Sequence, residues 1–247
     1  MSDKQIAVVT GANKGIGREI AKQLAELGNA VVVGARNEQA GEQVVAEICA
    51  SGGEAVAVAL DVTDPGSAAA AAETVESLFG RVDALVNNAG ISHRPGSDFS
   101  GQLPRSANVD DIRFVFETNV FGVINVTSAF LPLLRKSRAA RIVNVSSSAG
   151  SFAMMTDPQS FESAPVALGY VPSKTALTAI TLQYARDLAA DNILVNAVCP
   201  GFVATDLNGH RGVLTPAEGA VSAVRMASIT ADGPTGTFTD VNGPVAW

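Results

Sequence analysis

The amino-acid sequence predicts an α/β protein built on a doubly wound, mostly parallel sheet with helices on both faces. Short apolar runs rich in valine and alanine alternate with longer stretches that have the pattern of helices. The apolar runs are nearly continuous, as expected for strands that are buried on both faces of a sheet. The composition agrees, since 47% of the 247 residues are hydrophobic and only 17% are charged. Repeated alternation of this kind predicts parallel strands joined by right-handed crossovers.

The individual elements can be assigned from this pattern. The expected strands are residues 6–9, 30–33, 55–60, 84–86, 141–145 and 193–198, with a short last strand at 237–240. The expected helices are residues 15–27, 37–50, 65–79, 109–134 and 170–190, and a further helix begins at Thr215 and Pro216. Asp64 and Pro65 illustrate a well-marked helix start, because they fit an N-cap and a first helical turn. No linker or repeat divides the chain, so we expect one domain over residues 1–247 with a cofactor-binding half at about 1–145.

Two stretches interrupt the alternation, residues 92–107 and 150–169. Both are long for loops inside a compact domain, and both follow predicted strands. Ligands of parallel sheets bind beyond the carboxyl ends of the strands, and long loops at such places are usually functional. We therefore expect these two stretches, together with a segment at about 200–215, to form the walls of a substrate pocket.

The scarce residue types exclude several classes of site. Two cysteines and two histidines are too few for a disulfide scaffold or a cysteine-rich zinc site, and no acidic spacing suggests a metal centre. A formal net charge of −7 argues against nucleic acid or an anionic membrane as the main partner. The N-terminus lacks a signal-peptide pattern, and no apolar stretch approaches the ~20 residues of a membrane span. We expect a cytoplasmic protein without a metal.

The first predicted strand leads directly into a glycine-rich turn and then into a helix. The turn contains Gly11, Asn13, Lys14, Gly15, Ile16 and Gly17. Glycines allow a tight turn and close backbone approach, and the start of the helix offers N–H groups and a positive dipole end to a phosphate. The spacing differs from G-x-G-x-x-G, but the position after the first strand favours a dinucleotide site over a purely structural left-handed turn.

The end of the second predicted strand bears on the choice of cofactor. An NAD site usually has an acidic residue about 20 residues beyond the glycines, whereas this chain has Arg36 at that place. Arg36 and Lys14 can bind a 2′-phosphate, the arginine through its planar fork and the lysine as a point charge. The alternative is that both are solvated surface cations. The sequence favours NADPH/NADP+ over NADH.

Tyr170 and Lys174 are four residues apart in a predicted helix and therefore lie on the same helix face. A nearby ammonium stabilises a phenolate and lowers the pKa of the phenol, which makes a tyrosine a usable general acid for a carbonyl oxygen. Tyr184 lies fourteen residues farther on, about 21 Å along the helix axis, and cannot share the same site. We expect Tyr184 to be a packing residue.

Together these motifs resemble the short-chain dehydrogenase/reductase family over essentially the whole chain. The motifs that occur in the order of that family are the glycine turn, the run 87–90, Asn119, Ser146 with Ser147, Tyr170 with Lys174, and Pro200 with Gly201. Within the family, the stretches 10–17 and 199–209 look most like the NADPH-dependent carbonyl reductase branch. The resemblance implies a single-domain Rossmann-type fold with a seven-stranded sheet, and reduction of a ketone or aldehyde.

The resemblance also implies a role for each matching residue. Tyr170 would be the general acid, and Lys174 would lower its pKa and bind the nicotinamide ribose. Ser147 would steady the substrate oxygen, and Asn119 would hold a water that links Lys174 to solvent. Further cofactor contacts would come from residues at the other strand ends, namely Asp61, Val62, Asn88, Ala89, Gly90, Pro200, Gly201, Val203 and Thr205.

The chain departs from the family pattern at one point. Ser147 lies 23 residues before Tyr170, a longer separation than is usual in the family, and the additional residues fall within 150–169. Alternation along the strand favours Ser147 as the functional serine. The other candidates are Ser146, Ser148, Ser160 and Ser163. The same segment enters the helix that the family often uses to form homo-oligomers, so it can alter assembly as well as the pocket.

The expected pocket walls are apolar and adaptable, which suits a small apolar substrate. They comprise Phe152, Met154, Met155, Phe161, Phe202 and Leu207. We expect an NADPH-dependent reductase of ketones or aldehydes, with a reversible reaction. Two alternatives remain. A 3-ketoacyl-carrier-protein reductase would need a basic patch for its acidic carrier, and a non-catalytic NADP-binding regulator would not need the intact pair of Tyr170 and Lys174.

Overall fold

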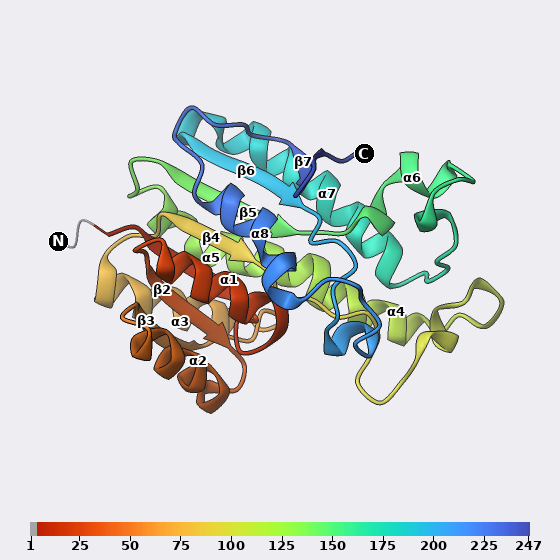
Figure 1. Cartoon of the computed structure of the whole chain (residues 1–247), viewed down its shortest axis with the longest axis horizontal. Helices are drawn as coiled ribbons and strands as arrows, with labels where there is room; N and C mark the ends of the chain where they lie inside the picture. The colour runs from red at the N-terminus through yellow and green to blue at the C-terminus, as the bar shows by residue number, and fades with distance from the viewer. Residues whose placement is uncertain (1–3) are drawn as a thin grey trace.

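A computed structural model describes residues 4–247, and all the strands of these residues belong to one central sheet (Figure 1). The strand order is β3-β2-β1-β4-β5-β6-β7-β8, and every neighbouring pair is parallel except β7 and β8. The strands are β1 (Ile6–Thr10), β2 (Ala30–Ala35), β3 (Glu54–Ala59), β4 (Ala84–Asn87), β5 (Ala140–Val145), β6 (Ile193–Val198), β7 (Phe238–Asp240) and β8 (Gly243–Pro244). The predicted α/β class is confirmed, but the sheet has eight strands rather than seven. The additional strand is only two residues long and pairs through a tight turn, so it has no apolar pattern to reveal it.

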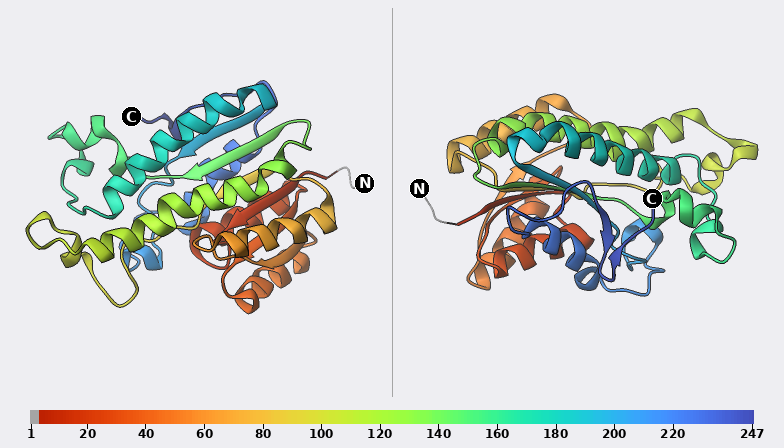
Figure 2. Two further views of the ribbon diagram at one scale, coloured as in Figure 1. Left: turned by 180° about the vertical axis from the view of Figure 1, so that it is seen from behind. Right: turned by 90° about the horizontal axis from the view of Figure 1, so that it is seen from above.

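Helices cover both faces of the sheet, as the right-hand view of Figure 2 shows. On one face lie α1 (Gly15–Glu26), α2 (Glu38–Ala50) and α8 (Pro216–Ala227). On the other lie α3 (Pro65–Phe79), α5 (Gly122–Leu134) and α7 (Tyr170–Asp187), with α4 (Val109–Phe116) extending the α5 layer. The short α6 (Phe152–Thr156) lies beyond the sheet.

The strands supply side chains to two hydrophobic cores, one on each face of the sheet. Within β1, Ile6 and Val8 belong to the core cluster on the α3, α5 and α7 side, whereas Ala7 and Val9 belong to the cluster on the α1, α2 and α8 side. Side chains alternate between the faces of a strand, so a continuous apolar run feeds both layers. β3 is the exception, because it lies at the sheet edge and its end residues Glu54 and Ala59 are exposed. The expectation of burial on both faces is therefore wrong for β3.

The strand order reverses direction at β1, which lies between β2 and β4. Crossovers before this point run to one side of the sheet and later ones to the other, so a crevice opens at the carboxyl ends of β1 and β4. In Figure 1 the segments 92–107 and 150–169 both project from the end of the sheet toward which the strand arrows point. The expected position of both segments beyond the strand ends is therefore observed.

Neither segment is structureless. The first contains 3-10 turns at Phe99–Gln102 and Pro104–Ser106, and the second contains α6 and a 3-10 turn at Phe161–Ser163. These short elements form because local side chains cap them, as when the Asp98 carboxylate accepts a hydrogen bond from the backbone N–H of Ser100 (2.8 Å).

One continuous helical stretch, Val109–Leu134, is long and apolar enough to cross a membrane by length and composition alone. This corrects the expectation that no apolar stretch approaches that length. Core packing accounts for its character, because Val126, Phe130 and Leu134 are fully buried in the cluster under the sheet. A π-helical turn at Glu117–Phe121 interrupts the stretch at Asn119.

Candidate active site

The turn after β1 requires glycine at three positions. Gly11 and Gly15 have φ of +62° and +56°, a left-handed conformation that other residues rarely adopt. At Gly17 the limit is space, since an added Cβ would lie 2.4 Å from both the Asn88 Nδ2 and the Gly11 carbonyl oxygen. The expected tight turn with close packing of helix on strand is observed.

The same turn is tied to the segment after β4. The Asn88 side-chain amide donates to the carbonyls of Thr10 (2.9 Å) and Gly11 (3.2 Å). The Thr10 hydroxyl accepts hydrogen bonds from the backbone N–H groups of Asn88 and Ala89, both at 3.0 Å. These bonds fix the glycine turn against the run 88–90, so both border the crevice at the strand ends.

The residues around the crevice fit a dinucleotide cofactor. Helix α1 has no side-chain cap and no acidic residue in its first turn, so its first N–H groups remain available for a phosphate. Thr205 faces this turn, since a Cβ on Gly15 would lie 3.5 Å from its methyl group. Val62 is buried against Gly122, and the Asp61 carboxylate accepts hydrogen bonds from Thr63, so both are held at the end of β3.

The two predicted phosphate-binding cations are in different environments. Arg36 is exposed just beyond the end of β2, and no acidic group pairs with it among residues 4–247. Lys14 forms a salt bridge of 2.6 Å with the Asp206 carboxylate, which also contacts the His210 ring at 2.9 Å. The hydrogen bond from Lys14 holds the pKa of Asp206 below its usual value. Lys14 therefore links the glycine turn to the segment that follows β6.

Tyr170, Ser147 and Lys174 come together at the carboxyl end of β5. The Ser147 side chain lies close enough to the Tyr170 phenol to oppose the rise in its pKa. The Lys174 Nζ lies 5.8 Å from the centroid of the Tyr170 ring and donates to the Val145 carbonyl at 2.9 Å. The structure thus brings the three predicted side chains into one cluster.

The other serines that the sequence left open have different partners. The Ser146 hydroxyl is buried and donates to the Lys174 carbonyl (3.1 Å), and the Ser148 hydroxyl donates to the Glu162 carboxylate. Ser160 and Ser163 make hydrogen bonds within their own turn. Ser147 is therefore the serine that contacts the Tyr170 hydroxyl.

The protonation energetics differ from the expectation that Lys174 lowers the pKa of Tyr170. Burial raises the pKa of Tyr170 to about 12, and the hydrogen bond from Ser147 only partly offsets it. Burial also lowers the pKa of Lys174 to about 8. Both shifts have one physical cause, since a buried site disfavours the charged form of each group.

Asn119 lies in the π-helical turn and is completely buried. Its Oδ1 accepts from the backbone N–H of Ile91 (2.9 Å), and its Nδ2 donates to the Ile91 carbonyl (2.9 Å) and the Ser173 hydroxyl (3.0 Å). A Cβ on Gly90 would lie 3.3 Å from Asn119 Oδ1 and 3.5 Å from Lys174 Nζ. Asn119 therefore holds the segment after β4 beside Lys174, and its expected contact with a water stays a prediction.

Gln102 is a site residue that sequence reasoning missed. It is fully buried although it belongs to the polar segment 92–107. Its Oε1 accepts from the backbone N–H groups of Gly169 (3.1 Å) and Tyr170 (2.9 Å), and its Nε2 donates to the Ser92 carbonyl (2.7 Å). It therefore caps the start of α7 from a different segment, and no local pattern in the sequence signals such a contact.

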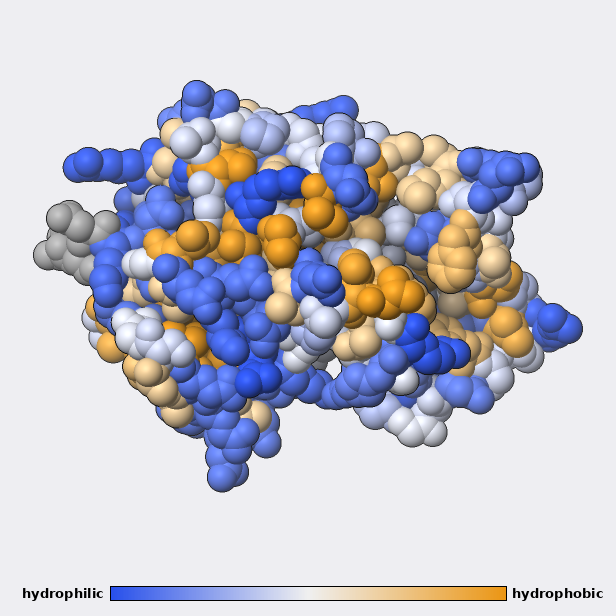
Figure 3. Space-filling view, in the orientation of Figure 1, coloured by the Kyte–Doolittle hydropathy of each residue, from blue (hydrophilic) through white to orange (hydrophobic). Residues whose placement is uncertain are grey.

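The predicted pocket walls are only partly brought together. Met155 and Tyr170 both pack against a small buried cluster that includes Val171, and the Phe161 and Phe202 rings lie 6.1 Å apart. Leu207 is joined to the segment after β4 through its carbonyl, which accepts from the Ser92 hydroxyl (2.8 Å). Phe152 is exposed beside Ala153, whose N–H donates to the Trp247 carbonyl at the C-terminus. In Figure 3 hydrophobic residues gather over α8 and the segment that precedes it.

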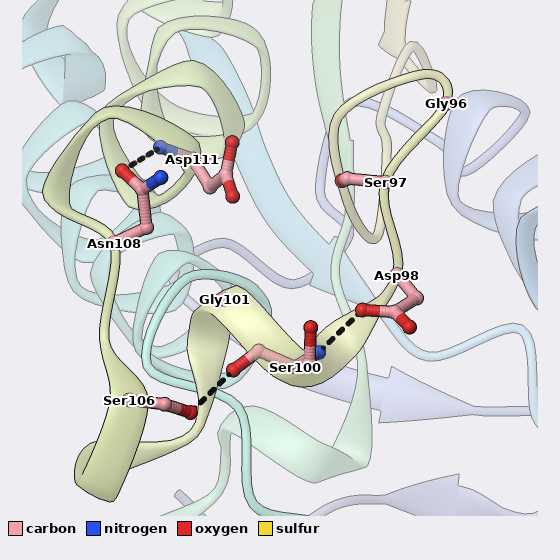
Figure 4. Close-up of a pocket in the computed structure, with 8 residues that line it drawn as sticks. All are labelled: Gly96, Ser97, Asp98, Ser100, Gly101, Ser106, Asn108 and Asp111. Atoms are coloured by element: carbon pink, nitrogen blue, oxygen red, sulfur yellow. Dashed lines mark hydrogen bonds between the residues drawn. The ribbon is translucent and has the colours of Figure 1, made fainter.

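A separate hollow lies between the 92–107 segment and the start of α4 (Figure 4). Its lining is polar, and hydrogen bonds within the segment shape it, such as that from the Ser106 hydroxyl to the Ser100 carbonyl (2.8 Å). The lining residues are Gly96, Ser97, Asp98, Ser100, Gly101, Ser106, Asn108 and Asp111. None of the predicted site residues lines it, so we do not assign it to the substrate.

Comparison with known proteins gives a consistent picture. A family model described as "short chain dehydrogenase" matches residues 5–212. The short-chain dehydrogenase anuI of Penicillium roqueforti (strain FM164) is 39% identical over 234 residues, covering 91% of this chain and 89% of that protein. A 3-oxoacyl-[acyl-carrier-protein] reductase of Synechocystis sp. (strain ATCC 27184 / PCC 6803 / Kazusa) is 38% identical over 204 residues, covering 82% of this chain and 76% of that protein.

A solved structure is similar over nearly the whole length. The NADPH-bound carbonyl reductase from chicken fatty liver superposes with a TM-score of 0.83 at 28% sequence identity, covering 99% of each chain. The likeness therefore extends to the segments that surround the crevice as well as to the sheet.

Proposed function

The chain belongs to the short-chain dehydrogenase family, and from that premise we propose that it is an NADPH-dependent reductase of ketones or aldehydes. Membership makes it an oxidoreductase that acts on small molecules with a nicotinamide cofactor. The observation that supports the finer assignment most directly is the position of the Ser147 side chain close to the Tyr170 phenol, with Lys174 Nζ 5.8 Å from the centroid of the tyrosine ring. Two hydroxyl groups that converge at a strand end are suited to holding one carbonyl oxygen.

In this proposal the bound cofactor supplies a hydride to the carbonyl carbon. Tyr170 supplies the proton to the carbonyl oxygen, and its raised pKa of about 12 keeps the phenol protonated at neutral pH. Ser147 donates a hydrogen bond to the same oxygen and orients it. Lys174, tethered to the Val145 carbonyl, places its ammonium beside the phenol and stabilises the phenolate that forms when Tyr170 gives its proton to the substrate.

The preference for NADPH over NADH stays a proposal and is supported by Arg36. Its guanidinium lies beyond β2, at the place where NAD-binding chains usually have an acid, and it has no acidic partner among the described residues. Lys14 is a weaker candidate than the sequence implied, because its ammonium is engaged by Asp206.

The direct test compares Tyr170→Phe with Tyr184→Phe in NADPH oxidation against a panel of ketones and aldehydes. Tyr184 is a matched control, since it is a partly buried tyrosine of the same helix that packs against the core. We expect Tyr170→Phe to lower kcat by ~10²-fold or more and Tyr184→Phe to leave it within about twofold. Equal rates in both variants contradict the acid role. NADPH binding without turnover of any carbonyl supports a regulatory binding protein instead.

A second candidate is a 3-oxoacyl-carrier-protein reductase, favoured by the 38% identity to the Synechocystis protein. The net charge of −7 and the 150–169 segment favour the first candidate, because an acidic carrier needs a basic docking surface. Measuring kcat/KM for a 3-oxoacyl group as its carrier-protein thioester and as its small thioester separates the two. A strong preference for the carrier-bound form supports the second candidate.

A further inference from the structure

One carboxylate at the proposed active site has no role in the reaction described above. Glu162 lies in the 3-10 turn Phe161–Ser163 of the 150–169 segment and is partly buried. The Ser148 hydroxyl donates to its carboxylate, and Ser148 directly follows Ser147. The Ser148 backbone N–H and hydroxyl also contact the Cys199 sulfur, at 3.3 and 3.5 Å. Through Ser148, the turn that carries Glu162 is therefore connected to the residues that follow β5 and β6.

The charge of Glu162 also influences the pKa of Tyr170. After burial, electrostatic interactions with Cys199 and then with Glu162 raise the pKa of Tyr170. No lysine, arginine or histidine among residues 4–247 forms a salt bridge with Glu162. A carboxylate that is half-buried and lacks a cation gains the most from a positively charged ligand.

The turn that carries Glu162 also contributes to an aromatic pair. The preceding residue, Phe161, pairs with Phe202 from the segment after β6, and both side chains are exposed. Aromatic faces attract organic cations as well as apolar groups. A carboxylate in the same turn as an exposed pair of phenyl rings is a combination that suits an alkylated ammonium group.

We propose that Glu162 is a substrate-binding residue for a protonated amine, so that the preferred substrate is a ketone or aldehyde with an apolar body and one ammonium group. This inference rests on the proposed carbonyl reduction at Ser147 and Tyr170 and names its substrate class. Ser147 and Ser148 are consecutive, with Cα atoms about 3.8 Å apart. Because the residue that follows Ser147 binds Glu162, the carbonyl and the ammonium would belong to one small molecule.

The test uses two ketones of nearly the same shape, phenyl N-methylpiperidinyl ketone and phenyl methylcyclohexyl ketone, in which a CH replaces the ammonium nitrogen. In the full-length protein we measure kcat/KM with NADPH and, by calorimetry in the presence of NADP+, the dissociation constant of each ketone. Wild type should prefer the amine. Glu162→Gln keeps the shape and the hydrogen bond to Ser148 but removes the charge, and should reduce that preference by about 10-fold to 100-fold.

Asp157→Asn is the matched control, because Asp157 is an exposed carboxylate of the same segment that caps only the backbone N–H of Gln159. Asp157→Asn should leave kcat/KM and the dissociation constant unchanged for both ketones. If Glu162→Gln lowers kcat/KM equally for both ketones, the proposal is overturned and Glu162 only stabilises the 150–169 segment. Equal binding of the two ketones by wild type, or binding of neither, also overturns it. Loss of turnover with a retained binding preference instead contradicts the reductase function alone.

Discussion

The side-chain oxygen of Gln102 accepts a hydrogen bond from the backbone N–H of Tyr170 at 2.9 Å, across 68 residues of sequence. It also accepts one from Gly169 at 3.1 Å, and a Cβ on Gly169 would lie 2.6 Å from this oxygen. Helix α7 has no side-chain cap of its own at Gly169. The position of the proposed general acid is therefore set by a residue of the opposite pocket wall.

Replacing Gln102 by leucine should lower both stability and kcat. The change leaves two backbone N–H groups of a buried helix start without an acceptor, at a cost of about 1–3 kcal/mol each. It also frees the first turn of α7, so we expect kcat to fall by ~10-fold or more while the KM for NADPH stays near the wild-type value. Chemical denaturation and steady-state kinetics measure the two effects.

Gln159→Leu is the control for this variant, because Gln159 is an exposed residue of the other pocket wall. The two effects of Gln102→Leu are separated by assaying activity well below the unfolding transition. If kcat there equals that of wild type and only the unfolding free energy falls, Gln102 stabilises the fold without positioning Tyr170.

Lys174→Met should raise the unfolding free energy at pH 7 while abolishing reduction. The pKa of Lys174 is lowered from 10.5 to about 8 in the folded chain by burial, so the unfolded chain binds more protons between those two values. Stability therefore rises with pH across this window, and the cost of burying the ammonium is fully present below pH 8. We expect the stabilisation by methionine to shrink from pH 8 to 10.5, measured as Tm against pH.

The rate of reduction should depend on pH through the same lysine. The pKa of Tyr170 is raised to about 12, so the acid form persists at every pH of a practical assay. The Lys174 ammonium, by contrast, loses its proton as pH rises through about 8. We expect kcat/KM for reduction to be level below pH 8 and to fall above it. In Lys174→Arg, whose guanidinium stays charged, any remaining activity should lack this descending limb.

The sequence was sufficient to predict the elements whose patterns are local. The bounds of α3 and β6 agree with the prediction at both ends, because Asp64 and Pro65 mark a helix start and a continuous apolar run marks a buried strand. The gathering of Ser147, Tyr170 and Lys174 was expected from the resemblance to the short-chain dehydrogenase/reductase family, whereas helix spacing alone predicted only that Tyr170 and Lys174 share a face.

Contacts between distant loops were not predictable in this way. Lys14 and Asp206 are 192 residues apart, and their salt bridge depends on the path of the segment after β6. Gln102 and Glu162 lie in irregular segments, where a polar residue gives no periodic signal of burial. Their partners are a backbone N–H and a serine hydroxyl, and neither pairing has a sequence signature.

Gly17→Ala should abolish cofactor binding without unfolding the chain. The new Cβ would lie 2.4 Å from the Gly11 carbonyl oxygen, a backbone atom that can move only if the glycine turn opens. We expect the dissociation constant for NADPH, measured by fluorescence, to rise by ~10²-fold or more. Gly66→Ala is the control, since its Cβ meets only the Asp64 side chain at 3.2 Å in an ordinary helical conformation. Tight NADPH binding by Gly17→Ala would show that the turn does not hold the cofactor.

Arg36→Asp should exchange the cofactor preference. The substitution removes the cation that we assign to the 2′-phosphate and supplies the acid that commonly binds a ribose hydroxyl. We expect the KM for NADPH to rise by ~10-fold or more and the KM for NADH to change little or fall. Lys14→Ala should have a smaller effect on NADPH, because the Lys14 ammonium is engaged by Asp206. Arg186→Asp, an exposed arginine late in α7, controls for the change in net charge. Parallel changes in both KM values for Arg36→Asp would remove the argument for a 2′-phosphate site at this strand end.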